Sequence, residues 1–129
     1  MREYNILGVA SRAKKKADKF AKEFDIRPFY SYEDLLEVES LEAVYIPLPN
    51  SLHYEWVKNS LNKGLHVLVE KSMACNYNEA IELNELAKQK GLALIENFQF
   101  RFHLQLKHIE SLIDSGMIGE LRNVRASFG

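Results

Sequence analysis

A glutamate and a lysine, Glu70 and Lys71, follow directly on an apolar run of the sequence. The run, residues 65–69, is broken only by a histidine and is typical of a strand buried on both faces. In open α/β sheets, ligands bind beyond the carboxyl ends of the strands, so this pair stands where a cofactor or a substrate would be met. A lysine ammonium there could donate a hydrogen bond to a carbonyl oxygen on which negative charge develops. The alternative is that both charges are only solvated surface groups, and position alone does not decide between the two interpretations.

The elements that must position this pair alternate along the chain. Strands are predicted at residues 6–10, 43–46, 65–69 and 92–95, with amphipathic helical patterns between them. Pro28 is expected to break the pattern after the first helix. The predicted helix starts are Ser11, Ser31, Ser51 and Asn76, and the predicted ends of the last two helices are Gly64 and Gly91. This alternation favours an α/β fold, in which a parallel sheet is covered by helices on both faces.

The C-terminal part of the sequence continues differently. One more amphipathic helix is predicted through Leu106 and Ile113 and ends at Gly116, and residues 121–128 then alternate as a strand does. We therefore expect a first domain over residues 1–120, and we assign residues 121–129 to the first strand of a second domain.

Composition excludes several classes of function. The 129 residues carry 17 Lys and Arg against 18 Asp and Glu, a net charge of −1, which does not favour a nucleic-acid partner or an anionic membrane. Cys75 is the only cysteine, which excludes an internal disulfide and a cysteine-based zinc cluster, so no metal site is predicted. No stretch has the length of a signal peptide core or of a membrane span, and the expected location is the cytoplasm.

Glycines are missing where a dinucleotide site would need them. No G-x-G-x-x-G occurs, although such a loop lets backbone amides approach a pyrophosphate. Ser11 and Arg12, at the end of the strand at residues 6–10, occupy the kind of place that reads the adenosine ribose about 20 residues beyond that loop. We therefore expect the first strand, the glycine loop and the first helix to lie upstream of Met1, with a chance strand-helix start as the alternative. In the strand order 3-2-1-4-5-6, this strand would lie between the strands at residues 6–10 and 65–69.

Several stretches together are specific to one family. They are VASR at 9–12, VYIPLPNSLHYEW at 44–56, HVLVEKSMA at 66–74, IENFQFRFH at 95–103 and LIDSGMIGELRNVRASFG at 112–129. The chain resembles the nucleotide-binding half of the Gfo/Idh/MocA oxidoreductases, named after glucose-fructose oxidoreductase, inositol dehydrogenase and rhizopine catabolism. The resemblance implies a Rossmann-type, doubly wound parallel sheet that binds NAD or NADP, and a second domain that holds a sugar or polyol. Residues 95–103 are most similar to the branch that reduces nucleotide-linked keto-sugars.

The resemblance also implies roles for individual residues. Lys71 matches the catalytic lysine of the family's Glu-Lys-Pro motif, but Ser72 stands in place of the proline, which puts the local backbone geometry in question. For His53 a helix-capping or surface role is the alternative, and for Arg101 it is packing against the next helix. The residues expected to contact the cofactor are Ser11, Arg12, Pro47, Pro49, Asn50, His53, Glu70, Lys71, Asn97 and Arg101.

Arg12 bears on the choice of cofactor. A guanidinium fork suits a 2′-phosphate, whereas sites that prefer NAD usually place an acidic residue nearby, so NADP is the expected cofactor and NAD remains possible. The predicted function is part of an NAD(P)-dependent oxidoreductase of a sugar, a polyol or a nucleotide-linked keto-sugar, homo-oligomeric at full length. These 129 residues alone are expected to be inactive. The alternative is a non-catalytic remnant or binding protein that retains the fold.

Overall fold

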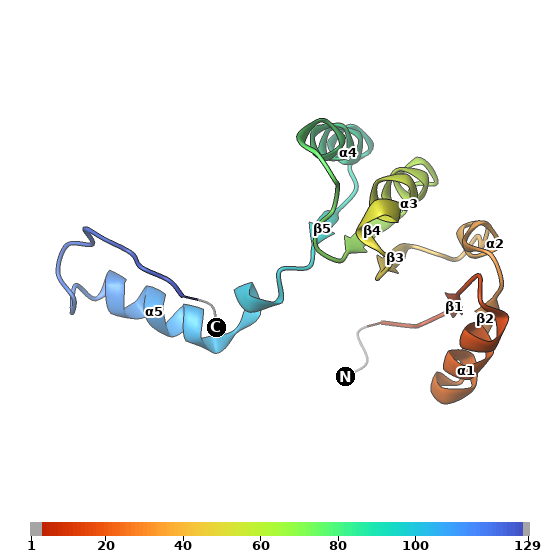
Figure 1. Cartoon of the computed structure of the whole chain (residues 1–129), viewed down its shortest axis with the longest axis horizontal. Helices are drawn as coiled ribbons and strands as arrows, with labels where there is room; N and C mark the ends of the chain where they lie inside the picture. Colours follow the sequence, from red (N-terminus) through yellow and green to blue (C-terminus); the bar gives the residue numbers. More distant parts are fainter. Residues whose placement is uncertain (1–3, 128–129) are drawn as a thin grey trace. The chain divides into compact units, whose positions relative to one another are not determined.

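The structure is a computed structural model that describes residues 4–127, and by its internal contacts the chain divides into two units, residues 1–97 and 98–129. The first unit alternates strands and helices throughout (Figure 1). Its elements are β1 (Gly8–Ala10), α1 (Lys14–Phe24), β2 (Arg27–Phe29), α2 (Tyr32–Leu36), β3 (Ala43–Ile46), α3 (Asn50–Asn62), β4 (His66–Val69), α4 (Tyr77–Lys90) and β5 (Leu94–Glu96).

The strands form two parallel sheets. In one, β1 pairs with β2, with Gly8 opposite Arg27 and Ala10 opposite Phe29. In the other the order is β3-β4-β5, with Tyr45 opposite Leu68 and Leu68 opposite Ile95. The predicted α/β class with parallel strands is therefore confirmed.

Strand β2 was not predicted, because Pro28 was interpreted as a break between helices. Proline cannot donate a hydrogen bond to a neighbouring strand, but it is tolerated where only one side of the strand is paired, and β2 pairs with β1 alone within the described residues. The additional strand changes the strand count. Since β3 pairs with β4, the prediction of a gap between the strands at residues 6–10 and 65–69 is wrong. Pairing is interrupted between β1 and β3, so the two sheets correspond to the 3-2 and 4-5-6 parts of the order 3-2-1-4-5-6.

Local signals at the helix ends were mostly correct. The Ser31 hydroxyl accepts from the Asp34 N–H at 3.0 Å and caps α2, and the Asn76 side chain accepts from the Glu79 N–H at 3.0 Å and caps α4. Gly91 ends α4 in the left-handed conformation, with φ of 67°. The prediction that Ser11 caps α1 is wrong: Ala13 occupies that position, and the Ser11 hydroxyl accepts from the Ala13 N–H at 3.2 Å.

The main core lies where α3 and α4 pack against β3 and β4. It consists of Val44, Ile46, Val57, Leu61, Leu65, Val67, Val69, Leu83 and Ala87. Burial alternates along β3 and β4, and Tyr45, Leu68 and Ile95 are 54%, 37% and 51% exposed. The prediction of strands buried on both faces is thus wrong in this structure, because α3 and α4 cover one face of the three-stranded sheet and leave the other open.

The second unit contains the 3-10 helix η1 (Gln99–Phe102) and α5 (Leu104–Asp114), which starts where the His103 ring accepts from the Gln105 N–H at 3.1 Å. Residues 121–127 form no strand, and position 128 lies outside the described residues. A strand needs a neighbouring strand for its backbone hydrogen bonds, and nothing in the described part of the chain pairs with this segment. That these residues open a second domain stays a prediction. Among the helices of residues 4–127, none combines the length and the hydropathy that passage through a bilayer requires.

Candidate functional site

The candidate site lies at the carboxyl ends of β3, β4 and β5. Because these strands are parallel, the segments that follow them meet at one edge of the sheet. The hydrogen bonding continues past the strands: the Glu70 N–H donates to the Ile46 carbonyl at 3.1 Å, and the Asn97 N–H donates to the Val69 carbonyl at 2.8 Å. The structure thus brings together the predicted residues that follow the three strands.

Glu70 is held by both neighbouring strands. Its Oε1 accepts from the Tyr45 hydroxyl at 2.7 Å and from the Asn97 side-chain amide at 2.6 Å. These hydrogen bonds, Tyr45 first and Asn97 second, lower the pKa of Glu70 below its ordinary value, and the bond to Glu70 raises the pKa of Tyr45. Glu70 is therefore held as a carboxylate in a fixed orientation.

Tyr45 was missed from the sequence, although a signal for it was present. Side chains alternate along a strand, so residues two apart lie on the same face. Tyr45 lies opposite Leu68, and Glu70 lies two residues after Leu68, so the side chains of Tyr45 and Glu70 are on the same open face of the sheet. The register itself could not be read from the sequence.

Lys71 extends from the turn after β4 and is exposed. Within residues 4–127 no ion pair engages its ammonium. The peptide bond between Lys71 and Ser72 is cis. The next residues are anchored by Glu96, another residue that sequence reasoning missed, whose Oε1 accepts from the Met73 N–H at 2.9 Å. The lysine side chain thus remains available while its main chain is held.

His53 lies in the first turn of α3 and is 0% exposed, so the surface role considered for it is wrong. Its Nδ1 lies 2.6 Å from the Ser72 carbonyl oxygen and its Nε2 lies 2.6 Å from the Leu48 carbonyl oxygen. The ring therefore bridges the segment after β3 and the segment after β4. Direct contact of His53 with a cofactor stays a prediction.

The other residues of the segment after β3 are accessible. Pro47 and Pro49 are exposed, and Pro49 immediately precedes α3, which starts at the exposed Asn50. The Asn50 carbonyl lies 3.7 Å from the Cys75 sulfur, so the segments after β3 and β4 approach each other at this point too. A ligand at the sheet edge would meet both.

Ser11 and Arg12 lie at the carboxyl end of β1, in the two-stranded sheet. The Ser11 N–H donates to the Phe29 carbonyl at 3.1 Å, which continues the pairing of β1 with β2. The Arg12 guanidinium is exposed and lies 5.9 Å from the centre of the Tyr32 ring, which in turn packs edge-on against Trp56. An accessible guanidinium next to a serine hydroxyl has the donors that a phosphate group requires.

Arg101 is on η1 of the second unit, and its contact with a cofactor stays a prediction. Within the described residues, no three His, Cys, Asp or Glu side chains gather in a group that could hold a metal ion.

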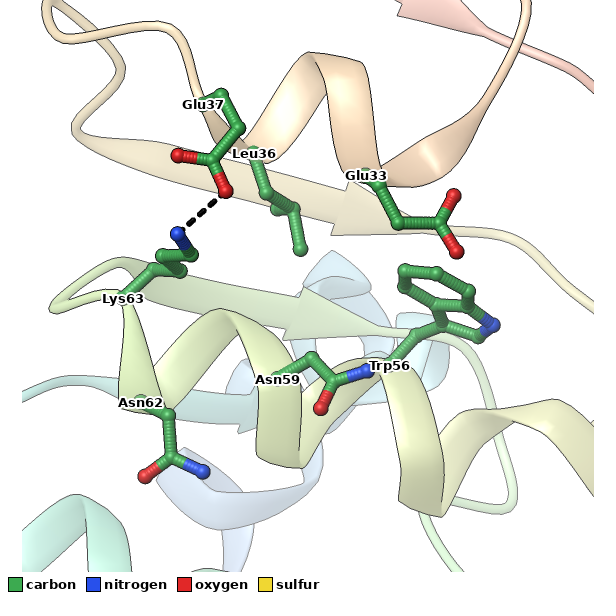
Figure 2. Close-up of a pocket in the computed structure, with 7 residues that line it drawn as sticks. All are labelled: Glu33, Leu36, Glu37, Trp56, Asn59, Asn62 and Lys63. Atoms are coloured by element: carbon green, nitrogen blue, oxygen red, sulfur yellow. Dashed lines mark hydrogen bonds and ion pairs between the residues drawn. The ribbon is translucent and has the colours of Figure 1, made fainter.

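A pocket of about 410 Å³ lies between α2 and α3 (Figure 2). Trp56 closes one end, and an ion pair between Lys63 and Glu37 spans the other. Its lining residues are Glu33, Leu36, Glu37, Trp56, Asn59, Asn62 and Lys63. None of the predicted site residues is among them, so this hollow is separate from the strand-end site.

Known proteins resemble the chain over nearly its whole length. The profile of the oxidoreductase family with an NAD-binding Rossmann fold, Gfo/Idh/MocA, matches residues 1–98. A dTDP-3,4-didehydro-2,6-dideoxy-alpha-D-glucose 3-reductase from Actinomadura kijaniata is 40% identical over 123 residues, which are 95% of this chain and 37% of the relative. D-xylose 1-dehydrogenase (NADP(+)) 2 of Haloferax volcanii is 38% identical over 127 residues, 98% of this chain and 39% of the relative.

A solved structure agrees with these matches. KijD10, a 3-ketoreductase from Actinomadura kijaniata in complex with NADP and TDP-benzene, superposes with a TM-score of 0.84 at 39% identity, over 90% of this chain and 36% of that protein. The chain therefore spans a little over a third of the length of the relatives that it matches.

Proposed function

Because the chain belongs to the Gfo/Idh/MocA oxidoreductase family, we propose that it forms the nucleotide-binding part of an NADP-dependent enzyme. The enzyme transfers a hydride to or from a sugar, a polyol or a nucleotide-linked keto-sugar. The observation that carries the proposal is the arrangement at the sheet edge, where an accessible lysine follows a glutamate held by two neighbouring strands. The dinucleotide, when bound, supplies or accepts the hydride.

Lys71 is the catalytic residue in this proposal. Its ammonium donates a hydrogen bond to the substrate oxygen, where negative charge develops as a carbonyl is reduced, and it gives up a proton there. In the oxidative direction the lysine accepts that proton. The exposure of its side chain supports this role, because the group has to reach a substrate outside the sheet edge.

Glu70 positions the cofactor. As a carboxylate it accepts hydrogen bonds, and a ribose hydroxyl is a matching donor. Asn97 and Tyr45 fix the direction in which it accepts. The segment from Pro47 to Asn50 forms the other side of the edge and contacts the nicotinamide end.

Ser11 and Arg12 select NADP. The residues fit a 2′-phosphate by the chemistry of their donors: a planar cation with several N–H groups and a hydroxyl that, having accepted from the Ala13 N–H, still has its own hydrogen to donate. Arg101 contributes a further cofactor contact in the complete protein, which we propose is a homo-oligomer.

The test uses the full-length gene product and follows the nicotinamide absorbance. A dTDP-linked 3-keto-sugar with NADPH and D-xylose with NADP⁺ are the first substrates, since relatives carry these activities in their names. Turnover of either, with Lys71→Ala lowering kcat by orders of magnitude and leaving NADP affinity nearly unchanged, is the expected result.

The matched control is Lys88→Ala, an exposed lysine in the last turn of α4 away from the site, which should not affect turnover. If Lys71→Ala turned over as fast as the parent, the catalytic assignment would be lost. NADP binding without turnover of any sugar or polyol would instead favour the non-catalytic alternative.

A further inference from the structure

One buried side chain connects the two segments that form the candidate site. His53 is 0% exposed, and its two ring nitrogens face two main-chain carbonyls, Ser72 on one side and Leu48 on the other, each at 2.6 Å. Leu48 belongs to the segment after β3, and Ser72 immediately follows Lys71 in the segment after β4. The ring is therefore positioned to set the spacing of the two segments.

The chemistry of the two contacts limits which of them can be a hydrogen bond. A carbonyl oxygen only accepts, so each contact is a hydrogen bond only if the nitrogen that makes it carries a hydrogen. A neutral imidazole has one N–H, and in either tautomer the other nitrogen would turn its lone pair toward a carbonyl oxygen. The ring can thus donate to either segment, depending on its tautomer, and it lies in close contact with the main chain of both.

We infer that His53 is a positioning residue for the reaction. Through its contacts with the Leu48 and Ser72 carbonyls it couples the two segments and so fixes the main chain from which Lys71 reaches the substrate. The inference rests on the proposed function in one respect, the identity of Lys71 as the reacting group.

The place of His53 in α3 explains why this tie is rigid. The same helix buries Val57 and Leu61 in the main core against β3 and β4. Lys71 itself is exposed and follows the last residue of a strand. Through His53, the main chain beside the lysine is anchored to the core instead of depending only on the turn. A reacting group displaced by about 1 Å can lose on the order of 10²-fold in rate, so such anchoring has catalytic consequences.

The first test compares variants of the full-length gene product in the assay described above. His53→Phe keeps a ring of similar size but removes both ring nitrogens, and kcat should fall by about 10²-fold with NADP affinity nearly unchanged. His53→Gln has an amide that can donate to one of the two carbonyls, and its kcat should lie between those of the parent and His53→Phe. This graded rescue is not expected from a residue that only fills space.

The matched control is Ser60→Ala. Ser60 is the other buried polar side chain of α3, and its hydroxyl donates within the helix to the Trp56 carbonyl at 2.6 Å, without reaching either segment. Removal of this hydroxyl should lower the melting temperature and leave kcat nearly unchanged. If His53→Phe and Ser60→Ala had the same effect on kcat, the positioning role would be refuted.

The second test measures hydrogen exchange of the main chain in the full-length gene product and is independent of turnover. In His53→Gln and His53→Phe the main-chain amides of the segment that follows Lys71 should exchange with solvent faster than in the parent, whereas Ser60→Ala should leave the exchange of this segment unchanged. Equal exchange of this segment in the parent and in both His53 variants would overturn the inference. The two proposals fail separately: an active Lys71→Ala removes the catalytic assignment but not the difference in exchange, whereas an inactive Lys71→Ala with an unimpaired His53→Phe removes only the role of His53.

Discussion

Gly8 is where a single added methyl group should disturb the main chain that leads to Ser11 and Arg12, the residues that we propose bind NADP. A Cβ at this position would lie 2.6 Å from the Arg27 carbonyl oxygen and 2.6 Å from the Phe29 ring, whereas ordinary contact begins at 3.4 Å. The Phe29 ring can turn, but the carbonyl belongs to the strand that pairs with β1. Gly8→Ala therefore requires β1 and β2 to separate locally by close to 0.8 Å, the difference between the 2.6 Å to the carbonyl oxygen and the 3.4 Å of ordinary contact.

The expected cost follows from that separation. Overpacking of this kind costs about 1–3 kcal/mol, and a widening of nearly 1 Å would stretch the bond from the Ser11 N–H to the Phe29 carbonyl beyond its present 3.1 Å. Taking about 2 kcal/mol, the equilibrium between the paired and the opened strand shifts by roughly 30-fold. Because β1 leads directly into Ser11 and Arg12, we expect NADP affinity to fall by up to a similar factor.

The assay is a titration of the full-length gene product with NADP together with a thermal melt. Gly64→Ala is the control, because Gly64 has φ of 81° with nothing within 4 Å of the added carbon, so its cost is conformational strain of about 1–2 kcal/mol without a clash. It should lower the melting temperature and leave NADP affinity unchanged. If Gly8→Ala bound NADP as tightly as the parent, the close approach of β1 to β2 would not position the Arg12 site.

Three further predictions concern other parts of the molecule. Arg12→Ala should weaken NADP much more than NAD in parallel titrations; equal weakening of both would contradict a phosphate contact. The folded-state pKa of Glu70 lies below its ordinary 4.5, so the stabilisation from its hydrogen bonds is fully present above that value and is lost as pH falls through the lower one. Asn97→Ala should raise this pKa and destabilise the protein. The difference in the free energy of unfolding between variant and parent, measured by chemical denaturation, should shrink on acidification. A difference that does not depend on pH would contradict a stabilising hydrogen bond from Asn97 to the Glu70 carboxylate. The 129-residue chain expressed alone should not give a soluble monomer that melts cooperatively and binds NADP. The reason is that pairing is interrupted between β1 and β3, and unpaired buried backbone groups cost about 1–3 kcal/mol each. Size-exclusion chromatography, thermal melting and NADP titration test this expectation.

Local features of this protein could be predicted from its sequence because their causes lie within a few residues. The caps at Ser31 and Asn76 involve a side chain and an N–H three positions later. The alternation of apolar runs with helical patterns likewise indicated the parallel α/β class and placed Glu70 and Lys71 at a strand end.

What the tertiary structure alone decided is how distant segments meet. Strand order depends on which edges pair, so the pairing of β3 with β4 and the strand around Pro28 were not visible in local patterns. Burial depends on which elements cover a face, which is why His53 is enclosed while Leu68, in an apolar run, remains partly open. The hydrogen bonds of Glu70 join residues 25 and 27 positions apart, and only folding brings such groups within bonding distance.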